Sequence, residues 1–249
     1  MSTSFPPIYV LSVKTFTDRI NHIQNELKKH NLQFEFIFNY DVYDIDEKTD
    51  KQFFLKDSNL SPAAKSITLK HITAWRNAVL NNYKQILVFE DDVVLNKNFT
   101  KNLTKLLEEI KKIPQEYLVF LGGADTKVPK EFFLSHSILY ELNMPTAEGY
   151  ITDLPAIQKR LAWLESNKIY LPADHATVKI DNDCRIKQYW VRQPLITQGS
   201  VFGLFPTTLD KSRSQKSPIL NRLIFEWKKL KRRTLPQTFY NITGIFRKK

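Results

Sequence analysis

Short apolar runs alternate with helix-like spacing over the first half of the chain. The runs at 8–13, 34–38, 86–89 and 117–121 predict β-strands. Between them, apolar residues recur every three or four positions, which predicts helices. This alternation favours an α/β fold, in which a mostly parallel sheet is covered by helices on both faces.

Local signals mark where several of these helices begin. Thr17 is the expected N-cap of the first helix, and Ser61 with Pro62 is expected to open the second. A later helix is expected to start at Asp153. The polar segment that follows it, 170–183, is expected to form a loop.

Three consecutive acids, Glu90, Asp91 and Asp92, follow the strand predicted at 86–89. Adjacent carboxylates repel each other and are seldom buried without a partner, so we expect a cation beside them. On an extended segment Glu90 and Asp92 point the same way. Such oxygen ligands suit Mg²⁺ or Mn²⁺ shared with substrate phosphates, and the carboxyl end of a strand is where these sheets bind ligands. A solvated acidic loop is the alternative.

Composition restricts the partners and the compartment. The formal net charge of +11 over 249 residues favours anionic partners such as phosphates, nucleic acid or anionic lipid. Cys184 is the only cysteine, which excludes an intramolecular disulfide and a cysteine-based zinc cluster and favours a reducing compartment. Because no apolar run approaches membrane-spanning length and no signal peptide is evident, we expect a cytoplasmic protein.

The chain divides by composition into a domain and a tail. We expect one domain over 1–211, in which the half at 1–121 carries the acidic triplet and the half at 122–211 faces the substrate. The tail, 212–249, is rich in lysine and arginine, and its apolar residues around Trp227 recur at helical spacing. Such a helix is typical of a segment lying on an anionic membrane. A helix packed on the domain is the alternative.

Two stretches carry a resemblance to a known family. They read "IYVLSVKTFTDRINHIQNELKKHNLQFEFIFNYD" and "LSPAAKSITLKHITAWRNAVLNNYKQILVFEDDVVL". Together they resemble glycosyltransferase family 25, the lipooligosaccharide galactosyltransferases of Gram-negative bacteria and the related collagen galactosyltransferases. Fainter matches follow at "PTAEGYITDLPAIQKRL", "YLPADH" and "QPLITQGS". The resemblance covers residues 8–95 well and does not extend to the tail.

The resemblance implies a GT-A-like single catalytic domain with a Rossmann-like sheet, a UDP-sugar donor, a Mn²⁺ or Mg²⁺ ion, and inversion at the anomeric carbon. Residues 1–121 would then hold the donor and metal, and residues 122–211 would hold the acceptor. Galactose is the family's commonest sugar, and the implied acceptor is a lipooligosaccharide or lipopolysaccharide glycan, including a lipid-linked oligosaccharide. An enzyme with such an acceptor would be peripheral on the inner face of the bacterial cytoplasmic membrane. No nucleic acid partner is expected.

The chain departs from the family pattern on its second predicted helix. Where the family commonly has Gly-Cys and then Ser-His, this chain has Ser66-Ile67 and then Lys70-His71. The histidine is kept and the serine is not, which leaves room for a different donor or acceptor preference.

By resemblance, Asp92 is the expected direct metal ligand and Glu90 the second contact, while Asp91 completes the donor cluster. Inversion also needs a carboxylate that takes the proton of the acceptor hydroxyl, and Asp174 is the candidate base. A helix N-cap after Pro172 is the alternative role for Asp174. His175 is a candidate third metal ligand.

Five further residues are candidates for the donor site. Arg19 would reach the phosphates, and Asp41 follows the second strand, where nucleotide-binding sheets often place an acid. His71 lies on the apolar face of its helix, where a hydrogen-bonded core histidine is the alternative. Val10 and Ser12, on and just after the first strand, complete the set.

Three classes of function compete at this stage: a metal-dependent glycosyltransferase, another phosphate-handling α/β metalloenzyme, and a nonenzymatic basic adaptor for membrane or nucleic acid. The chain contains neither a P-loop nor G-x-G-x-x-G, so nucleotide binding of those kinds has no support. An adaptor would explain the charge but not the acids after a buried strand. We therefore favour the glycosyltransferase.

Overall fold

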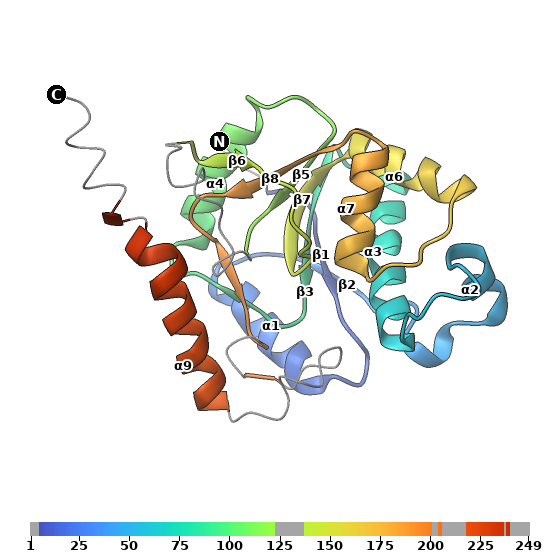
Figure 1. The fold of residues 1–249 in the computed structure, drawn as a ribbon, viewed down its shortest axis with the longest axis horizontal. Coiled ribbons are helices and arrows are strands. Elements are labelled where there is room, and N and C mark those ends of the chain that lie inside the picture. The colour runs from blue at the N-terminus through green and yellow to red at the C-terminus, as the bar shows by residue number, and fades with distance from the viewer. Residues whose placement is uncertain (1–4, 123–136, 201–203, 206–217, 237, 240–249) are drawn as a thin grey trace.

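The computed structural model describes residues 5–122, 137–200, 204–205, 218–236 and 238–239. Its centre is a seven-stranded sheet with helices on both faces (Figure 1). The strands are β1 (Ile8–Leu11), β2 (Glu35–Ile37), β3 (Gln85–Glu90), β5 (Tyr117–Phe120), β6 (Leu139–Glu141), β7 (Gly149–Asp153) and β8 (Lys187–Val191).

The spatial order of the strands is β2-β1-β3-β7-β5-β8-β6. β1 pairs in parallel with β2 and β3, and β5 pairs in parallel with β8. β7 runs antiparallel between β3 and β5, and β6 runs antiparallel to β8. The other five strands share one direction, which confirms the predicted mostly parallel α/β sheet. Because β5 lies between β7 and β8, the two predicted halves of the domain share a single sheet.

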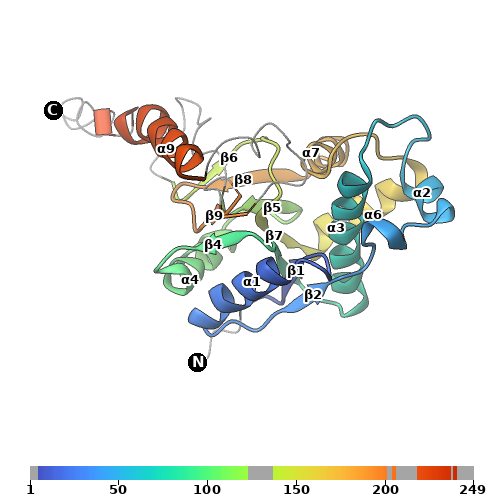
Figure 2. The same ribbon diagram turned by 90° about the horizontal axis from the view of Figure 1, so that it is seen from below.

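Each face of the sheet buries its own hydrophobic cluster beneath a layer of helices, and the two layers can be followed in Figure 2. On one face lie α1 (Thr17–Lys29) and α4 (Phe99–Ile110). On the other lie α3 (Pro62–Leu80), α6 (Leu154–Ser166) and α7 (Ala173–Asp183), with α2 (Glu47–Phe53) and the short 3₁₀ turn η1 (Val42–Asp44) beside them. Burial on both faces explains why β1, β3 and β5 are almost wholly apolar.

Two of the three predicted helix starts are confirmed. The Ser61 hydroxyl accepts a hydrogen bond from Ala64 N, and an Asp153 carboxylate oxygen accepts one from Ala156 N. The N-cap prediction for Thr17 is wrong, because Thr17 is already the first residue of α1 and Phe16 occupies the cap without a side-chain bond.

The predicted loop at 170–183 is also wrong, since most of it forms helix α7. The buried face of this helix consists mainly of small or polar residues, which hides its period from a hydrophobicity analysis. One of them, Asp181, is fully buried and accepts two hydrogen bonds from the Arg160 guanidinium, at 2.6 and 3.0 Å. Gln188 of β8 also donates to Asp181. The chain therefore holds α7 against α6 and β8 by a paired charge rather than by an apolar stripe.

A second, two-stranded sheet was not predicted. It pairs β4 (Val93–Leu95), directly after the acidic triplet, with β9 (Ile196–Gln198) in antiparallel register. The "QPLITQGS" segment is thereby brought to the carboxyl end of β3, although it lies about a hundred residues further along the chain.

The basic tail contains α9 (Pro218–Lys229), which continues into a π-helical turn, η2 (Leu230–Thr234). The predicted boundary between domain and tail, 211–212, lies outside the described residues. Among the helices of the described ranges, none combines the length and the apolar character that crossing a membrane requires.

Candidate active site

The acidic triplet lies at the carboxyl edge of the sheet, where Glu90 is the last residue of β3. The antiparallel neighbour β7 begins one residue after Glu148, and Glu90 N donates a 3.0 Å hydrogen bond to the Glu148 carbonyl. Residues opposite each other in an antiparallel pair place their side chains on the same face. Glu90 therefore meets a fourth acid, which the sequence analysis did not identify.

Asp91 is committed to partners within the protein. Its carboxylate accepts a 2.7 Å hydrogen bond from Ser12 Oγ and pairs with the Arg19 guanidinium at 2.9 Å. Burial raises the pKa of Asp91, and the Arg19 charge opposes this shift. The structure thus brings together three predicted donor-site residues, but it bonds them to one another. Their observed role is to join the ends of β1 and β3 to helix α1.

Asp92 is held differently. It is 1% exposed, its Oδ2 accepts a hydrogen bond from Ser200 N at 3.2 Å, and its carbonyl accepts one from Gly199 N at 2.6 Å. Its Oδ1 is buried without a hydrogen-bond partner. A buried carboxylate oxygen that lacks a partner is costly, and such exceptions often mark a binding site.

Like charges crowd this edge of the sheet. Burial, followed by the charges of Asp92 and Glu148, raises the pKa of Glu90 well above its usual range. Burial also raises the pKa of Glu148, although the Thr146 hydroxyl that donates to its carboxylate opposes the shift. A cation placed between these side chains would relieve their repulsion.

Glu90 and Glu148 line a cavity of about 500 Å³. Asp174, in the first turn of α7, lines the same cavity, and so does Gln198 of β9. The Asp174 carboxylate accepts a 2.8 Å hydrogen bond from His175 N, and the N-cap position belongs to Pro172, so the N-cap alternative for Asp174 is wrong. The predicted base, Asp174, and one of the predicted metal ligands, Glu90, therefore line the same cavity.

The donor set at this edge suits a hard divalent ion. Asp92 Oδ1 and the carboxylate of the nearby Glu90 offer oxygen ligands. Mg²⁺ is commonly held by one or two carboxylates together with substrate phosphates. Over the described ranges, however, no three His, Cys, Asp or Glu side chains form a group able to hold a metal ion. The predicted ligand set of Asp92, Glu90 and His175 is therefore not assembled, and His175 is exposed on α7.

Asp41 is tied into a buried ion pair. Its Oδ1 accepts a 2.7 Å hydrogen bond from Lys70 Nζ, which is 1% exposed and also donates to the Asn39 carbonyl. Ser66 Oγ donates to the neighbouring Tyr40 carbonyl at 2.6 Å. Two of the three residues by which this chain departs from the family pattern, Ser66 and Lys70, thus secure the loop after β2. That loop contains Asp41, which was predicted to lie at the donor site.

His71 and Val10 lie in the core. His71 Nδ1 is 2.9 Å from the Tyr150 hydroxyl, which also accepts a 3.0 Å hydrogen bond from Trp75 Nε1. This hydrogen bond is buried, and the pKa of His71 is lowered to about 3 by burial and then by the charge of Arg160. Val10 is fully buried within the other core cluster, so its side chain is not available to a donor.

Replacing His71 is expected to affect stability. In His71→Phe the Tyr150 hydroxyl would lose its hydrogen bond to His71 inside the core, which should lower the free energy of unfolding by about 1–3 kcal/mol. Thermal or denaturant unfolding measures this loss, and Leu80→Phe at the exposed end of the same helix is the control. A variant with unchanged stability but strongly reduced turnover would contradict the core role and return His71 to the donor site.

Sequence comparison assigns the family. The model of glycosyltransferase family 25, described as LPS biosynthesis protein, matches residues 5–144. This is more than half of the 249 residues, and the chain therefore belongs to glycosyltransferase family 25. The resemblance inferred from the motifs is confirmed.

Three relatives overlap with part of the chain. A putative glycosyltransferase of Haemophilus influenzae (strain ATCC 51907 / DSM 11121 / KW20 / Rd) is 40% identical over 36% of this chain and 33% of its own. The probable inactive glycosyltransferase 25 family member 3 of Bos taurus is 39% identical over 38% of this chain and 16% of its own length. The lipooligosaccharide biosynthesis protein lic2B of Haemophilus influenzae is 28% identical over 45% of this chain and 43% of its own length. The aligned segments span less than half of each relative.

Among solved structures, the apo-form glycosyltransferase GlyE of Streptococcus pneumoniae TIGR4 aligns over 97% of this chain and 64% of its own, with 10% identity and a TM-score of 0.47. At this level the likeness is too general to carry any detail of the site.

Proposed function

We propose that the protein is a metal-dependent inverting glycosyltransferase that moves a hexose from a nucleotide sugar to a glycan acceptor. The observation that carries the proposal is the shared cavity that Glu90 and Asp174 line, together with the buried, unpartnered Oδ1 of Asp92 two residues after Glu90. This arrangement supplies carboxylate oxygen atoms for a cation and a further carboxylate for a base. Membership of family 25 supports the same reaction class.

In the proposed reaction the acceptor hydroxyl attacks the anomeric carbon of the donor sugar from the side of Asp174. The new bond joins the acceptor oxygen to that carbon as the bond from the carbon to the diphosphate oxygen breaks. The hydroxyl proton passes to the Asp174 carboxylate, and the nucleoside diphosphate leaves with the bonding electron pair. Attack opposite the leaving group inverts the anomeric carbon.

Asp92 would hold the divalent ion through Oδ1, with Glu90 as the second protein ligand. Bound there, Mn²⁺ or Mg²⁺ would offset the negative charge that develops on the departing diphosphate. The Gly199 and Ser200 amides orient Asp92 for this task. Asp91, fixed by Ser12 and Arg19, would act by positioning its neighbours rather than by touching the donor.

For the substrates, we propose UDP-galactose as donor and a lipooligosaccharide or lipopolysaccharide glycan as acceptor. The description of the family as LPS biosynthesis protein and the name of lic2B support the acceptor class. Galactose is the narrower part of the proposal and follows only from the family resemblance.

A donor screen tests the proposal. The full-length protein is incubated with UDP-galactose, UDP-glucose and other nucleotide sugars, with a lipooligosaccharide acceptor, and nucleoside diphosphate release is measured with Mn²⁺ and after chelation. We expect release with one donor that depends on both Mn²⁺ and the acceptor. Release without an acceptor would instead favour a phosphate-handling hydrolase, and an absence of release with every donor would favour a nonenzymatic adaptor.

A further inference from the structure

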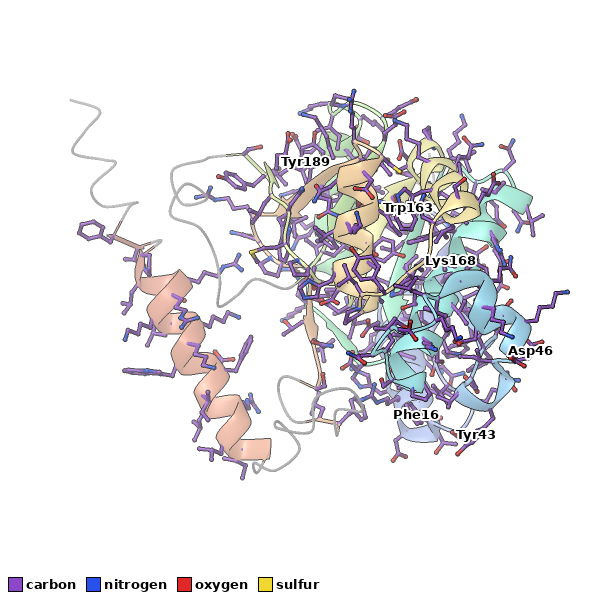
Figure 3. The ribbon with its side chains drawn as sticks, turned by 45° about the vertical axis from the view of Figure 1, so that its right-hand side comes forward. Phe16, Tyr43, Asp46, Trp163, Lys168 and Tyr189 are labelled. Atoms are coloured by element: carbon purple, nitrogen blue, oxygen red, sulfur yellow. The ribbon has the colours of Figure 1, made fainter. Side chains whose placement is uncertain are left out.

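The apolar side of the tail helix is exposed to solvent. Ile219, Leu223, Trp227 and Leu230 follow one another at spacings of four, four and three, so they share one side of the helix. All four are exposed, and Trp227 is 66% exposed. We call these four residues the apolar stripe. Figure 3 shows α9 standing beside the body of the molecule with its side chains projecting outward.

Positive charge accompanies the stripe. The described part of the tail contains Arg222 and a cluster that begins directly after Trp227, and its only acid is Glu226. The cluster consists of Lys228, Lys229, Lys231, Arg232 and Arg233. A helix that combines an exposed aromatic and aliphatic side with dense positive charge is typical of a segment that lies in the interface of an anionic bilayer.

The sequence alone left a second role open, in which the same apolar residues would cover the sheet. The structure gives that role to other elements, since α1 and α4 cover one face and α3, α6 and α7 cover the other. The apolar stripe belongs to neither core cluster. Its exposure therefore requires another explanation, because large apolar patches on a protein surface commonly mark interaction sites.

We propose that α9 docks the protein on an anionic membrane surface, with the apolar stripe inserted among the lipids and the basic cluster at the headgroups. The stripe argues against nucleic acid as the occupant, because phosphate contacts would leave Ile219, Leu223 and Leu230 exposed. The charge argues against a second copy, because pairing two such helices would bring like charges together on a chain whose formal net charge is already +11.

The tail also contacts the domain at the carboxyl end of β8. Arg233 donates a hydrogen bond to the carbonyl of Arg192, which directly follows β8. β8 runs in the same direction as β3, so the carboxyl ends of both strands lie at one edge of the sheet. Docking through α9 would hold this edge, with Glu90 and Asp92, close to the lipid surface. This part of the inference rests on the proposed function, because it would bring the site near a lipid-linked acceptor.

The test uses the full chain, without donor or acceptor, so that its outcome does not depend on catalysis. Co-sedimentation is measured with vesicles of phosphatidylethanolamine and phosphatidylglycerol and with phosphatidylcholine vesicles. We expect binding to the anionic vesicles only, and reversal at high salt. Changing Lys228, Lys229 and Lys231 to Glu should weaken binding by at least about tenfold. The same three changes at Lys97, Lys101 and Lys105, on and just before α4, are the matched control and should have a much smaller effect.

A second measurement reports insertion. Trp227 is the only tryptophan of the tail, whereas Trp75, Trp163 and Trp190 lie in the domain. Anionic vesicles should shift tryptophan emission to shorter wavelength in the wild type but not in Trp227→Phe. Leu223→Ser should weaken vesicle binding, while Leu80→Ser, at the exposed end of α3, should not. Unchanged melting temperatures would show that these variants are folded.

Three results would overturn the membrane proposal. The first is a folded wild type that ignores anionic vesicles at low salt. The second is a dimer in sedimentation that Leu223→Ser dissociates, since a second copy would then occupy the stripe. The third is binding to duplex DNA at the same salt that exceeds binding to anionic vesicles.

Discussion

Asp92→Asn is expected to reduce transfer about a thousandfold, because the metal contribution to leaving-group stabilisation is worth several kcal/mol. The exchange preserves side-chain volume, and an asparagine oxygen can still accept the hydrogen bond from Ser200 N. It also removes one of several crowded carboxylates. We therefore expect the melting temperature to stay the same or rise while turnover falls, a combination that simple unfolding cannot produce.

Nucleoside diphosphate release and Mn²⁺ titration in the presence of a nucleoside diphosphate measure the two effects. Asp57→Asn makes the same chemical change at an exposed acid and should leave both unchanged. Wild-type turnover by a folded Asp92→Asn protein would refute the proposed metal site.

Asp174→Asn is expected to lower turnover by about 10²–10⁴, the usual contribution of a general base, and to leave the affinity for the donor unchanged. The reason is that Asp174 is proposed to act on the acceptor hydroxyl and has no contact with Asp92 among the observed hydrogen bonds of the described residues. Turnover and donor affinity are measured separately, the second by equilibrium binding of the nucleotide sugar without acceptor.

Asp183→Asn provides the matched control on the same helix. Asp183 is an acid of α7 that pairs with Lys179, away from the cavity lining. If Asp174→Asn retained wild-type turnover, Glu148 would become the next candidate base because it lines the same cavity. If the variant lost donor affinity, Asp174 would be a ligand of the donor or its metal.

Several features of the molecule could be predicted from local sequence. Continuous apolar runs identified β1, β3 and β5, because a strand buried on both faces has to be apolar throughout. Ser61-Pro62 and Asp153 marked helix starts through hydrogen bonds that span only three residues. The acids at the end of β3 marked a candidate site because their type and position are both unusual.

Other features depended on contacts between distant residues. Glu148 became a site residue only because β7 pairs with β3 in antiparallel register, and nothing near Glu148 in the chain indicates this. Helix α7 was missed because the charge of Asp181 is neutralised by Arg160 rather than excluded from the core. From hydrophobicity alone, the two charged residues of such a buried ion pair are expected to lie on the surface.

By itself, then, the sequence determined the class of fold, the family and the place of the acidic triplet, since each of these depends on residues that are neighbours along the chain. Only the tertiary structure distinguished the two aspartates of the triplet: Asp91 is bonded to Ser12 and Arg19, while Asp92 keeps a buried oxygen without a partner. It also decided that the apolar stripe of α9 is exposed. The physical reason is the same in both cases, because hydrogen-bond satisfaction and burial depend on which distant segments meet, and the local pattern of residue types does not specify this.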